Sequence, residues 1–579
     1  MAMKRLVIAL LCAAMMTSVV LPSRAASLDG TYNSVMQVVP PSIPSYGLVI
    51  DESLTGGSST VVSRITASSL KNPVARNKVC RSVSDPHCAD MDGLSVQLVL
   101  PPCSDAASRM CVEGLEVGTN GSSLTKATLD HSVASTPTPA DSTIGLAAGG
   151  SPTLWKISSA TQVGGSDTYG VVVSVSYFQG IKQPSKLKFL TFSASVMPVA
   201  MTPQYANVAE VKEAIQKFGP YQGLMGIALG QKDGATGPRV ENLKCLWTEL
   251  ALCAQISSFA KESNVALTLR LNTDLTGWLF GRMKDVNVSS AQLDATNSTL
   301  RIEAKPVDVP AAIGWIPKSD ISKYPLIESY EKSLPGRGSG GYERVLTDPS
   351  SAWSGSGSSA GGFAGFTAYE PFLKPSQSQG ERWLISSITS DFFGAQSTTG
   401  NNASCLANTG KVLGIVTTNS MIYSPGPPEL KDGALSYKVA GLHKDFNGEV
   451  FKGTYDLAMR SETARCIYGF SNAPIRASVS VLSSDGSTND IASELVTEKN
   501  GWMTLSAKNF TFSSPTIRIK LSQSEKISTS ETAAPVKSEP AAQANNNSAK
   551  FKVIVCTKGK TIKKVSGTNP KCPSGFKKK

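Results

Sequence analysis

The chain has 579 residues, of which 41% are hydrophobic and 17% charged, and its formal net charge is +12. Low charge with abundant Gly, Ser, Thr and Val suits β-structure better than helical bundles, and the length predicts several domains. The charge is uneven: residues 1–25 contribute +3 and residues 550–579 contribute +10, which leaves about −1 for residues 26–549. The chain is therefore a near-neutral body with a basic tip rather than a basic protein throughout.

The N-terminus has the pattern of a secretory signal peptide. Lys4 and Arg5 precede a largely apolar run from Leu6 to Leu21, and Ser23-Arg24-Ala25 gives a small-residue exit, so we expect removal of residues 1–25. A retained membrane anchor fits less well because the apolar run is short. No later run reaches about 18 apolar residues, so we expect no transmembrane segment in the mature chain.

The cysteines agree with export. Without Cys12 there are ten, an even number, and they fall into neighbouring pairs. Zinc sites favour two to four intervening residues and usually recruit histidine, whereas three of these pairs have seven intervening residues and the chain has three histidines. We expect disulfides, although the sequence leaves the connectivity open and Cys80/Cys88 could exchange partners with Cys103/Cys111. The expected pairs are Cys80/Cys88, Cys103/Cys111, Cys245/Cys253, Cys405/Cys466 and Cys556/Cys572.

Alternation of apolar and polar residues predicts strands along most of the body. Helical signals are few: residues 207–218, stopped by Gly219-Pro220, are the best, and residues 246–261 form either a second helix or a loop with a short helix. The predicted fold is mainly β, a multidomain β-sandwich-like ectodomain with minor helix. The expected strands are at 169–178, 187–196, 265–271, 300–304, 477–481 and 517–521.

Composition divides the chain into successive parts. Residues 336–365 are rich in Gly and Ser and predict a loop without strand or helix core, and residues 523–549 predict a flexible linker. After the signal peptide at 1–25, the expected parts are a first β domain at 26–200, a central mixed α/β segment at 201–335, the loop at 336–365, a second β domain at 366–522, the linker at 523–549 and a basic disulfide-stapled module at 550–579.

No pattern in the body predicts a catalytic, cofactor or metal site. Gly357-Ser-Ser359-Ala-Gly361 fits a nucleophile elbow, but that motif needs a strand before it and a helix after it, and here the window is low-complexity. Single carboxylates such as Glu241, Glu249 and Glu381 are marked by no motif for glycoside hydrolysis. Asp90-Met-Asp92-Gly93 and residues 485–490 lack the closing glutamate of a calcium loop, and the latter favours a hairpin turn.

The basic module is the clearest functional signal in the sequence. Ten lysines without one acidic residue predict adhesion to an anionic surface, and secretion favours an anionic cell-wall polymer or an anionic lipid surface over nucleic acid. Phe551 and Phe576 are the only aromatic residues in it, so base stacking is not indicated. The expected binding residues are Lys550, Lys552, Lys558, Lys560, Lys563, Lys564, Lys571, Lys577, Lys578 and Lys579.

Three stretches carry a resemblance. Gly277-Trp-Leu-Phe-Gly-Arg-Met-Lys-Asp285, Arg460-Ser-Glu-Thr-Ala-Arg-Cys-Ile-Tyr-Gly-Phe470 and the end from Cys556 to Lys579 resemble those of uncharacterised secreted actinobacterial proteins. These proteins combine a signal peptide, a β-rich ectodomain and a lysine-rich, two-cysteine C-terminal tip. The resemblance implies a secreted, extracellular or cell-wall-associated protein of the bacterial envelope. It implies no activity and no catalytic residue.

Two functions are open at this point. The first is a non-enzymatic, envelope-associated binding or structural protein retained by its basic tip. The second is a secreted hydrolase acting on polysaccharide or ester, for which converging acids in a cleft, or Ser359 close to His443, would be the evidence.

Overall fold

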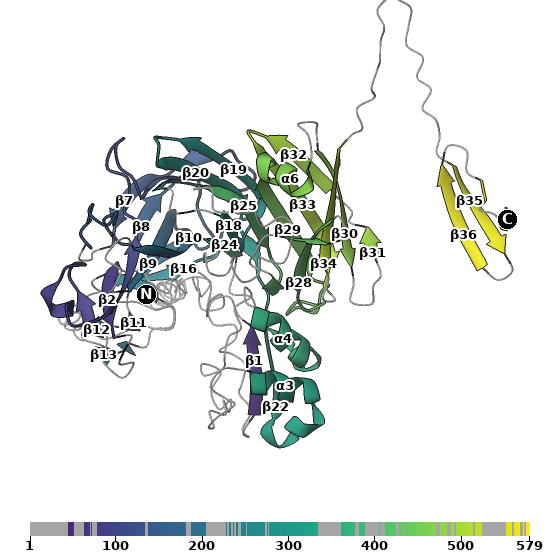
Figure 1. The fold of residues 1–579 in the computed structure, drawn as a ribbon, viewed down its shortest axis with the longest axis horizontal. Helices are drawn as coiled ribbons and strands as arrows, with labels where there is room; N and C mark the ends of the chain where they lie inside the picture. Colours follow the sequence, from purple (N-terminus) through teal and green to yellow (C-terminus); the bar gives the residue numbers. More distant parts are fainter. Residues whose placement is uncertain are drawn as a thin grey trace, which may run out of the picture. The chain divides into compact units, whose positions relative to one another are not determined.

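The computed structural model describes two compact units, Met1–Ser524 and Glu525–Lys579. Figure 1 shows the fold and labels many of the helices and strands. The described residues are 45–50, 63–69, 71, 78–133, 137–180, 187–203, 227–228, 231–232, 235–236, 239–240, 245–249, 252–272, 275, 277–333, 360–376, 381–387, 405, 411–423, 428–431, 434–469, 475–482, 488–490, 494–512, 516–523, 552–558, 561–567, 571–572 and 575–578.

A large sheet runs through the first unit. Among the described residues it has 16 strands, and its main path begins at β3 and ends at β32. The strands of this path, in sheet order, are β3 (Lys78–Cys80), β2 (Arg64–Ser68), β4 (Gly93–Val99), β9 (Thr168–Gly180), β10 (Lys188–Pro203), β24 (Glu381–Ser387), β18 (Gly277–Arg282), β25 (Val412–Thr418), β29 (Lys452–Arg460), β33 (Trp502–Thr511) and β32 (Glu494–Lys499). Residues from both expected β domains and from the central segment thus share one hydrogen-bonded sheet.

A second sheet packs on the first half of the large one. Its strand order is β19 (Lys284–Gln292), β20 (Asn297–Lys305), β17 (Asn264–Asn272), β5 (Cys111–Gly118) and β6 (Thr125–Lys126). Val265, Leu267 and Leu269 of β17 join Val96 and Phe192 of the large sheet in one buried cluster. Two sheets with a shared apolar interior form a β-sandwich.

A third sheet packs on the other half. It contains β26 (Ile422–Tyr423), β28 (Ala434–Ala440), β34 (Thr516–Gln523), β30 (Ile475–Leu482) and β31 (Thr488–Asp490), with β27 (Glu429–Lys431) beside β28. Tyr437 of β28 and Tyr455 of β29 lie in its core, with ring centroids 4.8 Å apart. The core also includes α6 (Ser461–Tyr468).

The third sheet and the large sheet thus form a second β-sandwich, and strand β18 contributes to the cores of both sandwiches. Leu279 is part of the first core, and Trp278 is part of the second. Successive side chains of a strand point to opposite faces, so one strand can supply both cores. Gly281 lies against the backbone of Leu384 on β24, where an added Cβ would overlap the Leu384 carbonyl oxygen.

A small sheet with two helices forms another part of the unit. It consists of β1 (Ser45–Ile50), β22 (Ala311–Pro317) and β23 (Lys374–Ser376), with α3 (Pro325–Ser333) and α4 (Ala360–Tyr369) packed beside it (Figure 1). The expectation of a loop throughout 336–365 is wrong at its C-terminal end, because helix α4 begins at Ala360. Phe363, Phe366 and Tyr369 recur at helical spacing toward this cluster, and Gly365 leaves room for the Tyr330 ring.

The segment expected as a helix or a loop at 246–261 is mainly a hairpin. Strands β15 (Cys245–Glu249) and β16 (Leu252–Ile256) pair antiparallel, and β16 also pairs with β10. Pairing with a distant strand decides this structure, and local sequence carries no signal for it. The expected helix at 207–218 and the signal peptide at 1–25 lie outside the described residues.

The predicted fold class is confirmed: the fold is mainly β with several sheets and few helices. All six expected strand segments lie in strands, with the single exception of Leu187, which precedes β10. The strands are β9, β10, β17, β20, β30 and β34. The expected hairpin around 485–490 agrees with the antiparallel pairing of Leu482 with Thr488.

Disulfides form as expected at three of the five pairs: Cys80–Cys88, Cys103–Cys111 and Cys405–Cys466. The alternative exchange between the first two pairs is thereby excluded. Cys572 is also disulfide-bonded. The backbone of β16 places Cys253 opposite Thr248, on the strand that begins at Cys245, and the bond between these two cysteines stays a prediction.

Candidate functional sites: a lysine-rich terminal unit and a charged cluster in the body

The C-terminal unit is a three-stranded antiparallel sheet. Its order is β36 (Thr561–Gly567), β35 (Lys552–Lys558) and β37 (Lys577–Lys578). The register places Cys556 of the central strand opposite Lys563 on one side and Lys578 on the other. Thr557 is likewise opposite Lys577. Four of the ten expected binding lysines, Lys552, Lys558, Lys563 and Lys564, lie in β35 and β36.

Part of the charge of this unit is presented to solvent. Lys571, Lys577 and Lys578 are exposed, and residues 550–579 contain no acidic side chain to neutralise them. Lys550, Lys560 and Lys579 lie outside the described residues. Like charges on neighbouring strands repel one another, and an anionic partner relieves that repulsion. The arrangement therefore suits binding to a dense anionic surface.

A charged cluster joins the five-stranded sheet to the large sheet. The Asp285 carboxylate, at the start of β19, contacts Lys508 Nζ on β33 and lies 3.5 Å from Lys305 Nζ on β20. The backbone N–H of Asp285 donates to Asp456 Oδ2 on β29 at 3.1 Å. The Ser506 hydroxyl donates to the other oxygen of Asp456. The cluster thus connects strands from two sheets.

Burial and pairing set the pKa values in this cluster. Burial raises the pKa of Asp456 to about 7, and the neighbouring carboxylate of Asp285 contributes. Burial also acts to raise the pKa of Asp285, but its contacts with Lys508 and Lys305 outweigh burial and lower it. Asp456 is therefore the carboxyl group of the cluster that is partly protonated near neutral pH.

Two further carboxyl groups lie opposite each other at the start of β24, an interior strand of the large sheet. Strand β21 (Val307–Asp308) pairs with β24 so that Asp308 faces Glu381 in register. Burial, followed by the charge of Asp308, raises the pKa of Glu381 to about 7. In the sequence no motif marks Glu381 as a catalytic carboxylate. Only the pairing of β21 with β24 brings Asp308 next to it.

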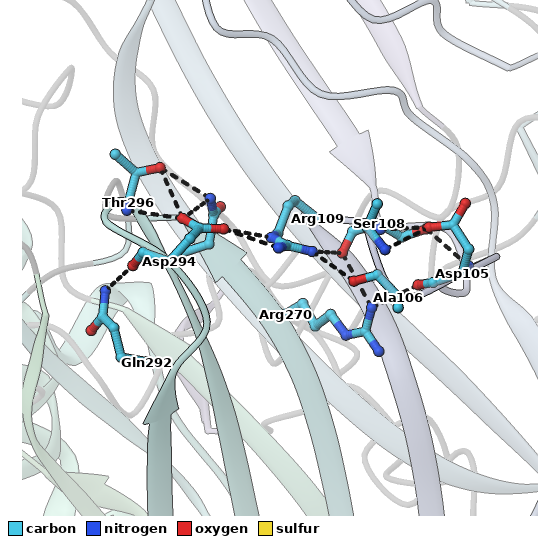
Figure 2. Close-up of polar contacts among 10 residues, drawn as sticks. Asp105, Ala106, Ser108, Arg109, Arg270, Gln292, Asp294 and Thr296 are labelled. Atoms are coloured by element: carbon cyan, nitrogen blue, oxygen red, sulfur yellow. Dashed lines mark hydrogen bonds and ion pairs between the residues drawn. The ribbon is translucent and has the colours of Figure 1, made fainter.

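A polar network lies at the rim of the first sandwich (Figure 2). Arg109 donates to Asp294 Oδ2 at 3.0 Å and to the carbonyl oxygens of Ala106 and Ser108. Arg270 donates to the Asp105 carbonyl at 2.7 Å and to Glu113 at 3.1 Å. These contacts fix the loop closed by Cys103–Cys111 against the β19–β20 turn. Figure 2 shows Arg109 between Asp294 and that loop, so the network has a structural role.

The stretches that carry the resemblance have structural contacts as well. Arg282 is fully buried and donates to the carbonyl oxygens of Thr418, Ser420 and Met421. Arg460 Nε donates to the Val412 carbonyl at 2.6 Å, and its guanidinium carbon lies 5.0 Å from the Trp502 ring centroid. Both arginines hold neighbouring strands together.

The other candidates from the sequence gain no support. Ser359 lies outside the described residues, and His443 is exposed. Asp90 is paired with Lys78 at 2.8 Å. Within the part of the chain that the structure describes, no group of three or more His, Cys, Asp or Glu side chains could hold a metal ion.

Sequence reasoning missed the cluster of Asp285, Asp456 and Lys508. Its only sequence signal is that the first resemblance stretch ends at Asp285. Searched over its described helices, the chain has none long and apolar enough to span a membrane. Comparison with protein-family models and with curated proteins gives no match.

Proposed function

We propose that the protein is a secreted, envelope-associated, non-enzymatic binding or structural protein, retained at anionic polymer or lipid by its basic C-terminal unit. The observation that carries the proposal is the compact, separate unit Glu525–Lys579, whose last thirty residues hold ten lysines and no acid. A β-rich body with local disulfides fits exposure to an oxidising environment. The resemblance to secreted actinobacterial proteins supports the same location.

Simple electrostatics supply the affinity. Each lysine close to an anionic surface contributes about 1 kcal/mol at low ionic strength. Several lysines acting together give firm binding, while each single contact stays weak and exchangeable. Exposed charges are screened over roughly 8 Å at physiological ionic strength, so the binding must weaken as salt rises.

Charge placement can be separated from net charge with two triple variants. The test variant carries Lys571→Gln, Lys577→Gln and Lys578→Gln, all at exposed sites of the terminal unit. The control carries Lys323→Gln, Lys332→Gln and Lys411→Gln, body lysines whose side chains are 64%, 73% and 45% exposed. Both variants lose the same charge.

Cosedimentation with purified cell walls and with anionic lipid vesicles measures the outcome. We expect the terminal variant to bind several-fold more weakly and the body variant to bind like the parent. Binding to walls alone assigns an anionic wall polymer, and binding to vesicles alone assigns a lipid surface. Equal losses in both variants would show that net charge, not the terminal unit, governs attachment.

The alternative, a secreted hydrolase, has one observation in its favour. Glu381 has a pKa raised to about 7 by burial and by Asp308, which is a property of general acids in glycoside hydrolysis. Glu381→Gln would then abolish hydrolysis of wall polysaccharide without changing attachment. Measured hydrolysis by the parent protein, lost in this variant, would promote the alternative.

A further inference from the structure

The contact between Asp285 and Lys508 joins two chain positions that are far apart in sequence. The residues are 223 positions apart, and they lie on β19 of the five-stranded sheet and β33 of the large sheet. Their side chains are 30% and 35% exposed, so the pair is partly withdrawn from water. A bond at this point would connect the five-stranded sheet to the large sheet.

Asp285 is held in an uncommon backbone conformation. Its φ is +58°, in the left-handed region, and the pairing of β19 with β20 shifts register between Lys284 and Asn287. Non-glycine residues adopt this region only at a cost, and such residues concentrate at sites with a specific role. Here the conformation is accompanied by the contacts of Asp285 with Asp456 and Lys508.

Asp456 supplies a buried acid next to the pair. It is 3% exposed, and its position on β29 is two residues from Thr454, the partner of Lys508 in the sheet register. Side chains two residues apart on a strand share a face, so Asp456 and Lys508 lie on the same face of the large sheet. Burial raises the pKa of Asp456 to about 7, which keeps a transferable proton beside the contact.

We infer that Lys508 and Asp285 condense into an intramolecular isopeptide bond, with Asp456 as the proton-transfer group. The amine nitrogen of Lys508 attacks Cγ of Asp285, the Nζ–Cγ bond forms, and one Cγ–O bond breaks. The departing oxygen leaves as water. The reaction needs no oxidant, reductant or added cofactor.

Protons balance within the cluster. Burial lowers the pKa of Lys508, but its pairing with Asp285 outweighs burial and raises it, so the pair starts as an ion pair. A proton must first pass from the ammonium to the Asp285 carboxylate, giving a neutral amine and a neutral acid. The protonated Asp456 then donates to the departing hydroxyl and regains a proton from the nitrogen. Asp456 is therefore protonated again at the end of the reaction.

Lys305 is the competing nucleophile, and the geometry favours Lys508. Lys305 Nζ is 3.5 Å from Asp285 Oδ2 and is shared with Glu262 at 3.4 Å. Lys305 also lies on β20, which already pairs with β19 through the sheet. Only Lys508 would link the two sheets covalently.

Intact-mass spectrometry of the full, reduced protein tests the inference. We expect the parent to be lighter than its chain by the mass of one water. Peptide mapping should recover a branched peptide that contains Asp285 and Lys508, which also distinguishes the bond from a cyclised aspartate. Lys508→Arg keeps the positive charge at Asp285 and should restore the full chain mass, while Lys305→Arg should not.

Asp456→Asn separates proton transfer from structure. We expect this variant to fold, as judged by circular dichroism, and to lose water at least tenfold more slowly or incompletely. A parent at full chain mass would show an ion pair only and overturn the inference. A branched peptide at Lys305, or unchanged water loss in Asp456→Asn, would overturn the assignment of Lys508 or of Asp456.

Discussion

The guanidinium carbon of Arg282 lies 4.2 Å from the centroid of the Tyr423 ring, at a position where Arg282 has no exposed surface. The arginine donates to three backbone carbonyl groups between Thr418 and Met421, the segment that leads from β25 to β26. One buried side chain thus fixes the passage of the chain from the large sheet to the third sheet. Cation–π contact with Tyr423 adds to its hydrogen bonds.

Replacing Arg282 should therefore destabilise the second sandwich. In Arg282→Met the three carbonyl groups lose their donor, and we expect a loss of about 3 kcal/mol in the free energy of unfolding. Arg282→Lys should lose about 2 kcal/mol, since an ammonium cannot reproduce the planar set of donors. Urea unfolding followed by circular dichroism measures both. Arg81→Met, at an exposed site, is the control, and equal effects at the two sites would contradict this role.

The disulfides should differ in their contribution to stability. Cys405 and Cys466 are 61 residues apart, whereas Cys80 and Cys88 are 8 apart. On the chain-entropy argument the longer loop contributes about 4 kcal/mol and the shorter about 2.5 kcal/mol. We expect Cys405→Ser/Cys466→Ser to lower the melting temperature more than Cys80→Ser/Cys88→Ser. The opposite order in calorimetry would show that native-state contacts outweigh the loop length.

Peptide mapping tests the expected disulfides that remain predictions, among them the bond between Cys245 and Cys253. Under denaturing, non-reducing conditions we expect no free thiol in protein recovered from an oxidising environment, because the ten cysteines of residues 26–579 can all pair. A peptide joining Cys245 to Cys253 is the expected product. Recovery of either residue as a thiol would contradict the pairing.

Most of the strands could be predicted from the sequence, because their evidence is local. Val265, Leu267, Leu269 and Leu271 alternate with less apolar neighbours, and all four are buried. Helix α4 was not predicted, because its glycines favour a loop. Phe363, Phe366 and Tyr369 nevertheless repeat at helical spacing. A pattern of aromatic residues inside a Gly-rich segment was the available signal.

The charged cluster could not be predicted for a different reason. Asp285, Asp456 and Lys508 come from three strands, and only the pairing of β29 with β33 and the packing of β19 bring them together. Glu381 meets Asp308 in the same way, through the pairing of β21 with β24. Such long-range pairings leave no mark in local composition or periodicity. The lysine-rich tip could be found because its signal is composition itself.

The stability of the first unit should fall as the pH rises from about 4 to about 7. The pKa of Asp456 is about 7 in the folded protein against an ordinary value of 3.8, so in this range the folded state binds more protons than the unfolded state. Glu381, with its pKa also raised to about 7, acts in the same direction. In the chain without the proposed cross-link, the Asp285 carboxyl group has a lowered pKa and contributes stability that is lost only at lower pH.

Asp456→Asn isolates the contribution of Asp456. The comparison is best made in the Lys508→Arg background, which keeps a positive charge beside Asp285 and cannot form the proposed cross-link. We expect the melting temperature of the Asp456→Asn protein to depend less on pH between 5 and 8 than that of its background. Parallel curves would mean that Asp456 titrates near its ordinary pKa.

Removal of the terminal unit should abolish attachment and leave the body folded. Truncation after Ser548 deletes all ten lysines of residues 550–579, and it leaves every described sheet of the first unit complete, because β35, β36 and β37 pair only with one another. We therefore expect an unchanged melting temperature of the body and a sharp loss of binding to cell walls or anionic vesicles. In the full chain the same binding should weaken between low and physiological salt. If the truncated and full proteins bind equally, or if salt has no effect, the lysine-rich unit does not anchor the protein and attachment must reside in the body.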